Sequence, residues 1–209
     1  MALHYSTRAK ARAHSFMLNE LDRHRIAPKR ILTLPSVDAH CALALRRHFG
    51  ETITQHQSED WTIPSPVVTE PGMTIIGIER QAMIVLRSTL VERGILQAYW
   101  ATTLAELTDS QGEIEVGESN AGRKRLSMRR LDPEGLERFD LLNLDLTCAY
   151  GPNLATAIRR AATRLLAPGG LVAITTLQRR DAYYGSGEHA HHHYRNANSA
   201  LTLTCWRPQ

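Results

Sequence analysis

Histidines lie close together near the end of the sequence, at positions 189, 191, 192 and 193. In an extended strand, His189, His191 and His193 would share one face, close enough for a metal ion to bridge two of them. The sequence has no definite fourth ligand beside them. We therefore predict a polar, partly exposed strand face that lines the substrate side and binds no metal, and metal binding is the alternative.

A second group of chemically active residues is a basic run between positions 123 and 130. Guanidinium and ammonium groups at this density can bind the phosphates of a nucleic acid, which we predict as a partner. A solvated surface face explains the same residues, and no aromatic residue lies among them to stack on bases. The basic run consists of Arg123, Lys124, Arg125, Arg129 and Arg130.

Glu79 directly follows the apolar run of residues 73–78 and precedes Arg80. A carboxylate at the carboxyl end of a buried strand can accept hydrogen bonds from both hydroxyls of a ribose. An acid favoured by the dipole of the next helix, or an ion pair with Arg80, explains the same residue. We favour the ribose-binding carboxylate.

Ser36 and Asp38 follow the apolar run of residues 31–34, one residue after Pro35. Their side chains could cap the next helix, or bind the charged end of a ligand together with the N-terminus of that helix. No glycine lies between Leu34 and Asp38. A side chain at each of these positions keeps a ligand away from the backbone.

The elements that must position these residues follow from the apolar periodicity. Short apolar runs alternate with helical patterns, which predicts a parallel sheet with right-handed crossovers and helices on both of its faces. Ligands of such sheets bind at the carboxyl ends of the strands. The predicted helices cover residues 5–25, 38–49, 81–93 and 152–166, and the predicted strands cover residues 31–34, 73–78, 95–100, 139–145 and 171–176, with a C-terminal antiparallel pair over residues 189–194 and 199–206.

Three further segments complete the predicted organisation of a single domain over residues 1–209. Residues 1–27 form an N-terminal helical extension, and residues 51–72 form an irregular connection with, at most, a short edge element. Residues 108–130 form a hairpin insertion, whose two arms are residues 113–118 and 123–130.

Composition limits the kind of protein. A chain of 209 residues that is 43% hydrophobic can bury one substantial core. No apolar run reaches the roughly 20 residues that cross a bilayer, and the first residues lack the apolar core of a signal peptide, so we expect a cytoplasmic protein. The cysteines, Cys41, Cys148 and Cys205, are odd in number and far apart, and we expect them to be reduced. The net charge of +4 and pI of about 9.2 permit a polyanionic partner, and a homo- or hetero-oligomer stays open.

The order of these elements resembles that of class I S-adenosylmethionine-dependent methyltransferases. Residues 31–36 occupy the place of the family's first strand and cofactor loop, and residues 74–80 look like the second strand with its ribose-binding acid. Residues 139–145 look like the fourth strand, and residues 165–175 are similar to the frequent leucine, proline, double-glycine entry into the fifth. The resemblance implies a Rossmann-like α/β fold with a mostly parallel sheet.

The resemblance also implies S-adenosylmethionine as the cofactor and a set of site residues. Glu79 would bind the ribose, the loop of residues 34–38 would lie near the methionine part, and Asp145 with residues 147–150 would face the methyl acceptor. The cofactor-binding residues predicted in this way are Leu34, Pro35, Ser36, Asp38, Glu79, Arg80 and Thr102, and the catalytic residues are Asp145, Cys148 and Tyr150.

The predicted catalytic loop matches two subfamilies only in part. Amino-group methyltransferases of nucleic acids carry two prolines there, which this sequence lacks. RNA cytosine-5 methyltransferases carry Asp, a variable residue, Pro and Cys; Asp145 and Cys148 match, but Thr147 replaces the proline. An activated Cys148 thiolate would attack C6 of a pyrimidine, whereas a small half-buried residue is the alternative. Tyr150 would stack on a base or pack in the protein.

We therefore predict an enzyme that transfers a methyl group from S-adenosylmethionine to a nucleic acid. The alternative is a catalytically inactive methyltransferase-like module that binds nucleic acid or a partner subunit, because the cofactor loop has lost its glycines. A third candidate, another nucleotide-binding enzyme on the same architecture, lacks the glycine loop that would bind phosphates.

Overall fold

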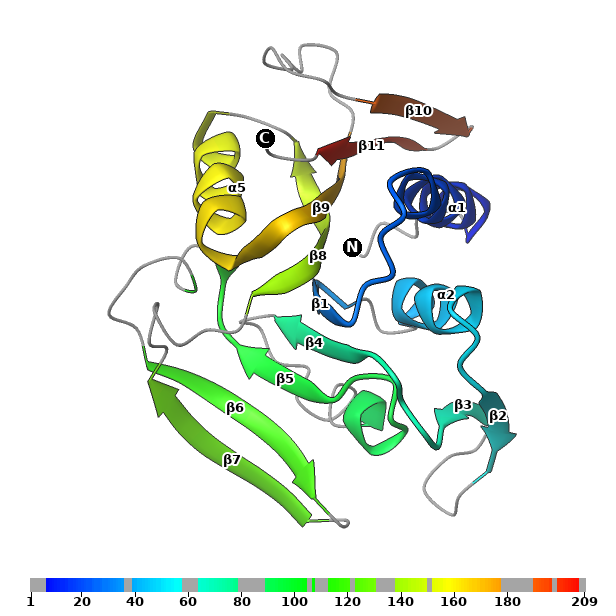
Figure 1. The fold of residues 1–209 in the computed structure, drawn as a ribbon, viewed down its shortest axis with the longest axis vertical. Coiled ribbons are helices and arrows are strands. Elements are labelled where there is room, and N and C mark those ends of the chain that lie inside the picture. The colour runs from blue at the N-terminus through cyan, green and yellow to red at the C-terminus, as the bar shows by residue number, and fades with distance from the viewer. Residues whose placement is uncertain are drawn as a thin grey trace.

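A nine-stranded sheet crosses the molecule in the computed structural model, in the order β10-β11-β9-β8-β1-β4-β5-β6-β7 (Figure 1). The structure describes residues 7–35, 39–57, 64–78, 89–104, 107, 113–120, 123–130, 138–149, 152–177, 190–196 and 199–206. The strands of this sheet, in chain order, are β1 (Arg30–Thr33), β4 (Thr74–Ile78), β5 (Ala98–Ala101), β6 (Glu113–Asn120), β7 (Arg123–Arg130), β8 (Phe139–Ala149), β9 (Leu166–Leu177), β10 (Ala190–Asn196) and β11 (Ser199–Trp206).

The central part of the sheet is parallel and its margins are antiparallel. β1 pairs in parallel with β4 and β8, β4 pairs with β5, and β8 pairs with β9. β11 joins β9 in the antiparallel direction and carries β10 on its other side. The predicted Rossmann-like α/β sheet and its C-terminal antiparallel pair are therefore confirmed.

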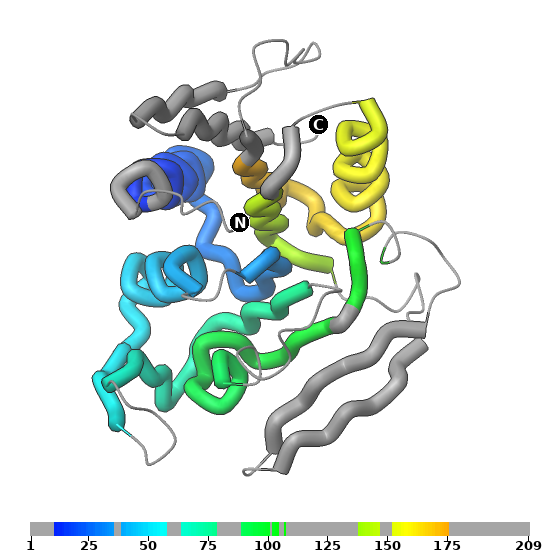
Figure 2. The backbone as a smooth tube through the Cα atoms, turned by 180° about the vertical axis from the view of Figure 1, so that it is seen from behind, coloured from blue at the N-terminus to red at the C-terminus, as the bar shows by residue number. Residues whose placement is uncertain are grey.

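Helices cover both faces of the sheet. α1 (Thr7–Arg23) and α2 (His40–His48) lie together on one face, and α5 (Pro152–Leu165) lies on the opposite side (Figure 2). The helices start and end within two residues of their predicted limits, because their apolar residues recur with a helical period. Residues 81–88 of the helix predicted over residues 81–93 lie outside the described residues, and residues 89–92 are helical.

Two cores form because successive residues of a strand point to opposite faces. Ile31, Ile75 and Leu141 pack on the side of α1 and α2, in the first core. Their neighbours Leu32, Ile76 and Leu142 pack on the side of α5, in the second core. All six side chains are at most 5% exposed, which explains why these strands are almost continuously apolar in sequence.

Two predicted strands have different limits in the structure. β5 begins at Ala98 instead of Ile95, because the main-chain N–H groups of Ile95 and Leu96 donate to the carbonyl of Leu90 and close the preceding helical turn. β8 runs four residues beyond Asp145 to Ala149, with an irregularity in its pairing to β9 between these two residues. The prediction that residues 147–149 form a loop is therefore wrong.

The connection between α2 and β4 is more regular than predicted. β2 (Ile53–His56) and β3 (Ser65–Val68) form a separate antiparallel sheet. Val68 is 3% exposed and packs in the first core, and its main-chain N–H donates to the carbonyl of Arg93 at 2.8 Å. This small sheet is thus fastened to the main fold through β3.

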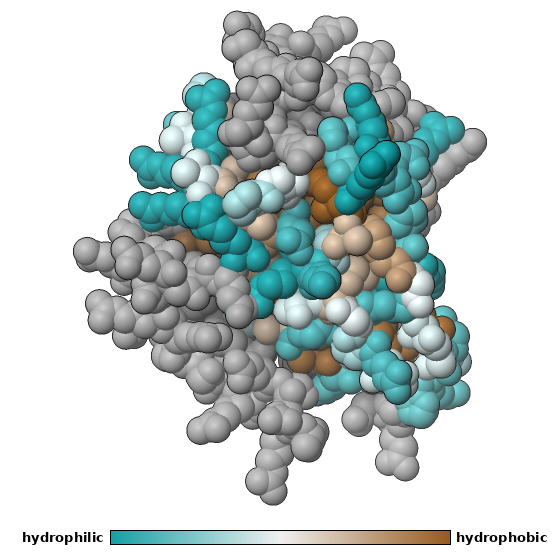
Figure 3. Space-filling view, in the orientation of Figure 1, coloured by the Kyte–Doolittle hydropathy of each residue, from teal (hydrophilic) through white to brown (hydrophobic). Residues whose placement is uncertain are grey.

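Surface and hairpin complete the picture of the described residues. β6 and β7 form a hairpin in which Asn120 pairs with Arg123, and β6 joins the sheet at β5. On the face drawn in Figure 3, hydrophilic residues cover most of the described surface, and hydrophobic residues show only in separate small areas. No described helix is long and apolar enough to cross a membrane.

Candidate functional site at the switch point of the sheet

The sheet has one point at which the chain reverses its direction of progress. From β1 the chain moves outward to β4 and β5, and the later strands β8 and β9 lie on the other side of β1. Open α/β sheets bind their ligands outside the carboxyl ends of the strands at such a point. We call the residues at this place the switch-point site: Thr33, Leu34, Pro35, Cys41, Gly77 and Asn143.

Asn143 of β8 connects three parts of the switch-point site. Its side-chain Nδ2 donates to Oγ1 of Thr33 at 3.0 Å and to Sγ of Cys41 at 3.1 Å. Its main-chain carbonyl accepts a hydrogen bond from the N–H of Leu34 at 3.1 Å. Asn143 and Thr33 are 4% and 2% exposed, so these contacts satisfy polar groups that water does not reach.

Pro35 lies against Gly77, at the carboxyl end of β4. A Cβ atom added to Gly77 would lie 2.9 Å from Cγ of Pro35 and 3.0 Å from Cδ1 of Leu96, closer than real contacts of this kind. Gly77 therefore lets the proline ring approach the strand. Leu34, beside it, is half-buried and packs against the second core.

The start of α2 corrects one interpretation of the loop after β1. The N-cap position of α2 is occupied by Ala39, whose φ is 47° and whose side chain makes no capping hydrogen bond. The alternative in which Ser36 or Asp38 is the N-cap residue is therefore wrong. Ser36 and Asp38 themselves lie outside the described residues.

Other predicted site residues fall at the same edge of the sheet or beyond what the structure describes. Ile78, fully buried, ends β4 immediately before Glu79, so the chain leaves the sheet at the switch point. Glu79, Arg80 and Tyr150 lie outside the described residues. Thr102 follows β5 two strands away from β1, is 1% exposed, and its Oγ1 donates to the carbonyl of Thr103 at 3.4 Å.

Asp145 and Cys148 both belong to β8. Asp145 is half-buried and stands opposite Thr175 of β9, two residues beyond Asn143 on the same strand. Cys148 lies in the irregular part of β8, between Asp145 and Ala149. The structure therefore brings Asp145 to the switch-point edge as a strand residue rather than as a loop residue.

The histidines of β10 lie far from the switch point in the order of strands. His191 pairs with Thr204 and His193 pairs with Thr202 of β11, and β10 is the last strand of the sheet on that side. His189 lies outside the described residues. Among the residues whose side chains are described, no group of three or more His, Cys, Asp and Glu residues could hold a metal ion.

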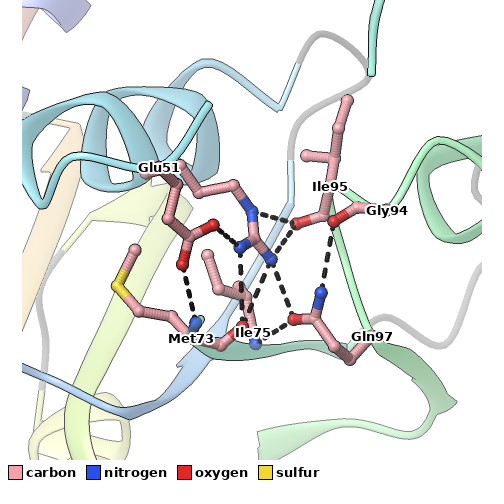
Figure 4. Close-up of polar contacts among 7 residues, drawn as sticks. Glu51, Met73, Ile75, Gly94, Ile95 and Gln97 are labelled. Carbon is pink, nitrogen blue, oxygen red and sulfur yellow. Dashed lines mark hydrogen bonds and ion pairs between the residues drawn. The ribbon is translucent and has the colours of Figure 1, made fainter. Parts of the chain in front are cut away.

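A buried charge lies at the opposite, amino-terminal edge of β4 and β5 (Figure 4). Arg46 of α2, 0% exposed, forms an ion pair with Glu51 and donates to the carbonyl of Ile95 and to Oε1 of Gln97, at 2.9 and 2.8 Å. Burial lowers the pKa of Arg46, while the hydrogen bond and the charge of Glu51 raise it. These contacts tie α2 to the starts of two strands and are structural.

The sequence analysis missed three residues of the switch-point site. Asn143 and Gly77 each interrupt an apolar run, residues 139–144 and 73–78, and this interruption is the signal that could have identified them. A buried polar residue needs a partner, and a glycine inside a strand often marks a close approach. Cys41 gives no such signal, because its partner Asn143 is distant in sequence.

Solved structures with a similar fold are described as methyltransferases or methylases. The Escherichia coli protein yhhF, described as a methyltransferase, has a TM-score of 0.51 and 11% identity, over 95% of this chain and 86% of that protein. The Haemophilus influenzae protein HI0767, described as a methylase, has a TM-score of 0.53 and 12% identity, over 94% of this chain and 98% of that protein. The cofactor-bound structure of Rv0187 from MTB has a TM-score of 0.52 and 14% identity, over 98% of this chain and 81% of that protein.

No protein-family model and no curated protein matches the sequence. At identities of 11 to 14%, the similarity to solved structures shows the fold alone. The predicted resemblance to class I methyltransferases is confirmed at this level.

Proposed function

We propose, from the methyltransferase fold, that the chain is an S-adenosylmethionine-dependent methyltransferase whose cofactor binds at the switch-point site. The observation that carries the proposal is the convergence of three segments there: the end of β1, the end of β4 and Asn143 of β8. The N-terminus of α2 follows directly, and its N-cap residue Ala39 has no side-chain acceptor. A helix N-terminus of this kind favours a carboxylate ligand.

In this proposal each predicted site residue has a role that its position supports. Glu79 follows the buried end of β4 and accepts hydrogen bonds from the ribose hydroxyls. The loop of residues 34–38 contacts the amino-acid end of the cofactor, and Arg80 and Thr102 border its nucleoside end. The cofactor supplies an electrophilic methyl group on a sulfonium ion.

The acceptor side of the proposed site is formed by β8 and the residues after it. Asp145 holds or removes a proton of the acceptor, Tyr150 stacks on it, and Cys148 is the candidate nucleophile. The protein accelerates the reaction chiefly by holding the acceptor atom in line with the methyl group. The proposed acceptor is a nucleic acid, because the basic run lies on β7, the last strand at its edge of the sheet.

Isothermal titration calorimetry tests the cofactor proposal. Wild-type protein is expected to bind both S-adenosylmethionine and S-adenosylhomocysteine, and Glu79→Ala is expected to weaken binding about tenfold to a hundredfold, because hydrogen bonds to a charged group contribute about 1.5–3 kcal/mol. Glu70→Ala, at an exposed glutamate, is the matched control and should bind like the wild type. Absence of heat with either ligand would exclude the enzyme and favour the inactive module.

A further inference from the structure

We infer that Asn143 is a positioning residue of the proposed cofactor site, because its amide holds both ends of the loop between β1 and α2, while Gly77 provides the seat for Pro35 in that loop. The inference rests on the proposed function. It explains how a loop without glycine keeps one arrangement next to a ligand.

The amide of Asn143 holds the two ends at once. Thr33 is the last residue of β1, and Cys41 is the second residue of α2. Both accept a hydrogen bond from the same Nδ2 atom, at 3.0 and 3.1 Å. Because an amide nitrogen carries two hydrogens, each end of the loop can take one of them.

Burial makes this double contact costly to break. Asn143 is 4% exposed and Thr33 is 2% exposed, so an opened loop would leave the amide without a partner in a place that water does not reach. The N–H of Leu34 also donates to the carbonyl of Asn143 and extends the pairing of β1 with β8 by one residue. The loop that is free to adapt therefore begins only at Pro35.

Gly77 fixes the next residue. Proline has a restricted φ and no N–H, so the ring of Pro35 can be held only by packing. The ring lies against the Cα of Gly77, where an added Cβ would be 2.9 Å from its Cγ. The glycine that permits a close approach thus lies on β4, and the loop itself carries none.

The consequence is a preformed loop. A loop held at Thr33, Pro35 and Cys41 loses less conformational entropy when a ligand binds than a flexible one. Weakening either the amide contacts or the seat of Pro35 should therefore reduce affinity more than it reduces the stability of the fold. This difference separates a positioning role from a merely structural one.

The experiment measures two quantities for each variant: the Kd of S-adenosylhomocysteine by calorimetry, and the rate at which iodoacetamide alkylates Cys41 in the free protein, followed by peptide mass spectrometry. Asn143→Ala should raise the Kd about tenfold or more, the effect of losing one to two hydrogen bonds, and should speed the alkylation of Cys41. Ile158→Ala, which weakens the second core on α5, is the control of similar instability and should change neither quantity at a temperature where it is folded.

Gly77 supplies an independent arm with a rescue. Gly77→Ala should raise the Kd because the new methyl group displaces the ring of Pro35, and the double variant Gly77→Ala, Pro35→Ala should recover part of the affinity because the ring is gone. Leu96, the other close neighbour, can shift the end of its side chain. If Asn143→Ala does not fold, Thr33→Val removes one of the two contacts and is measured instead.

The outcomes distinguish this inference from the proposed function. Wild-type affinity together with an unchanged Cys41 rate in Asn143→Ala would overturn the inference while the proposed function stands. A double variant no better than Gly77→Ala would overturn the role of Gly77. If the wild type binds neither ligand, the cofactor role fails with the proposed function, and the alkylation rates still decide whether Asn143 holds the loop.

Discussion

Arg46 is the largest fully buried side chain of the described residues, and it carries a charge. A buried charge is tolerated only when it is paired and hydrogen-bonded. Glu51 pairs with it, and the carbonyl of Ile95 accepts from both Nε and Nη2. Glu51 in turn accepts the N–H of Met73 at 2.6 Å, so losing the arginine would also leave a buried carboxylate without its counter-ion.

Replacement of Arg46 should therefore destabilise the fold strongly. We expect Arg46→Met to lower the free energy of unfolding by about 3–5 kcal/mol, the range for breaking a buried pair. The neighbouring Arg47 is exposed, and Arg47→Met should change stability by no more than about 0.5 kcal/mol. Urea denaturation followed by circular dichroism measures both, and equal midpoints for the two variants would contradict the argument.

Sequence patterns identify some site residues and miss those whose role depends on distant partners. Glu79 was selected because it ends an apolar run, and Asp145 because it ends another. Asn143 contacts Thr33, which is 110 positions away in sequence, and only the pairing of β1 with β8 brings them together. The same reason hides Arg46, whose partners come from three segments.

At the scale of elements, β3 meets the main fold at the end of the helical turn before β5. Gly94 has a φ of +67°, and a Cβ there would lie 2.2 Å from the carbonyl oxygen of Val68. Gly50, which follows α2, has a φ of +81° and no atom within 4 Å of such a Cβ. The two glycines share backbone strain for any other residue, and only Gly94 adds a clash.

Two alanine substitutions separate these effects. Gly50→Ala should cost about 1–2 kcal/mol of unfolding free energy, the cost of a left-handed backbone for a residue with a side chain. Gly94→Ala should cost clearly more, because β3 must also move away. Thermal and urea unfolding of both variants provide the measurement, and a Gly94→Ala protein as stable as Gly50→Ala would disprove the close contact with β3.

Elements with a repeated pattern are the ones that the sequence predicts well. α5 and the buried strands follow helical or strand periods over their whole length, so their limits differ little from the prediction. β8 is an exception, since the polar and small residues after Asp145 end the apolar run while pairing with β9 resumes at Ala149. β2 and β3 were missed because four residues each are too few to establish a period.

For the whole molecule, the β6–β7 hairpin extends the sheet beyond its parallel part. β6 carries three glutamates and β7 carries the five residues of the basic run. Arg125 stands opposite Glu118 and Arg130 opposite Glu113, so the acids of β6 offset only part of the charge. The hairpin therefore retains a positive balance at one margin of the molecule.

A salt titration of nucleic-acid binding tests the role of this margin. If the basic run contacts phosphates, replacing all five residues by glutamine should weaken RNA binding and reduce the slope of log K against log salt by about 0.7 per lost contact on a single strand. Fluorescence anisotropy at several salt concentrations measures both. The control carries five glutamines in place of exposed arginines on the helices and a turn, Arg23, Arg25, Arg47, Arg159 and Arg160, and loses the same charge. Equal slopes for the two variants would count against the hairpin.

β7 has one more consequence, which concerns two molecules rather than one. As the last strand of the sheet, it offers a row of main-chain donors and acceptors, and such an edge can pair with the same edge of a second copy. Antiparallel pairing of two copies of β7 would bring ten cationic residues into one ribbon. Their repulsion opposes this pairing, so the basic run protects the edge against self-association, and neutralising it should make the protein less soluble as well as less able to bind polyanions.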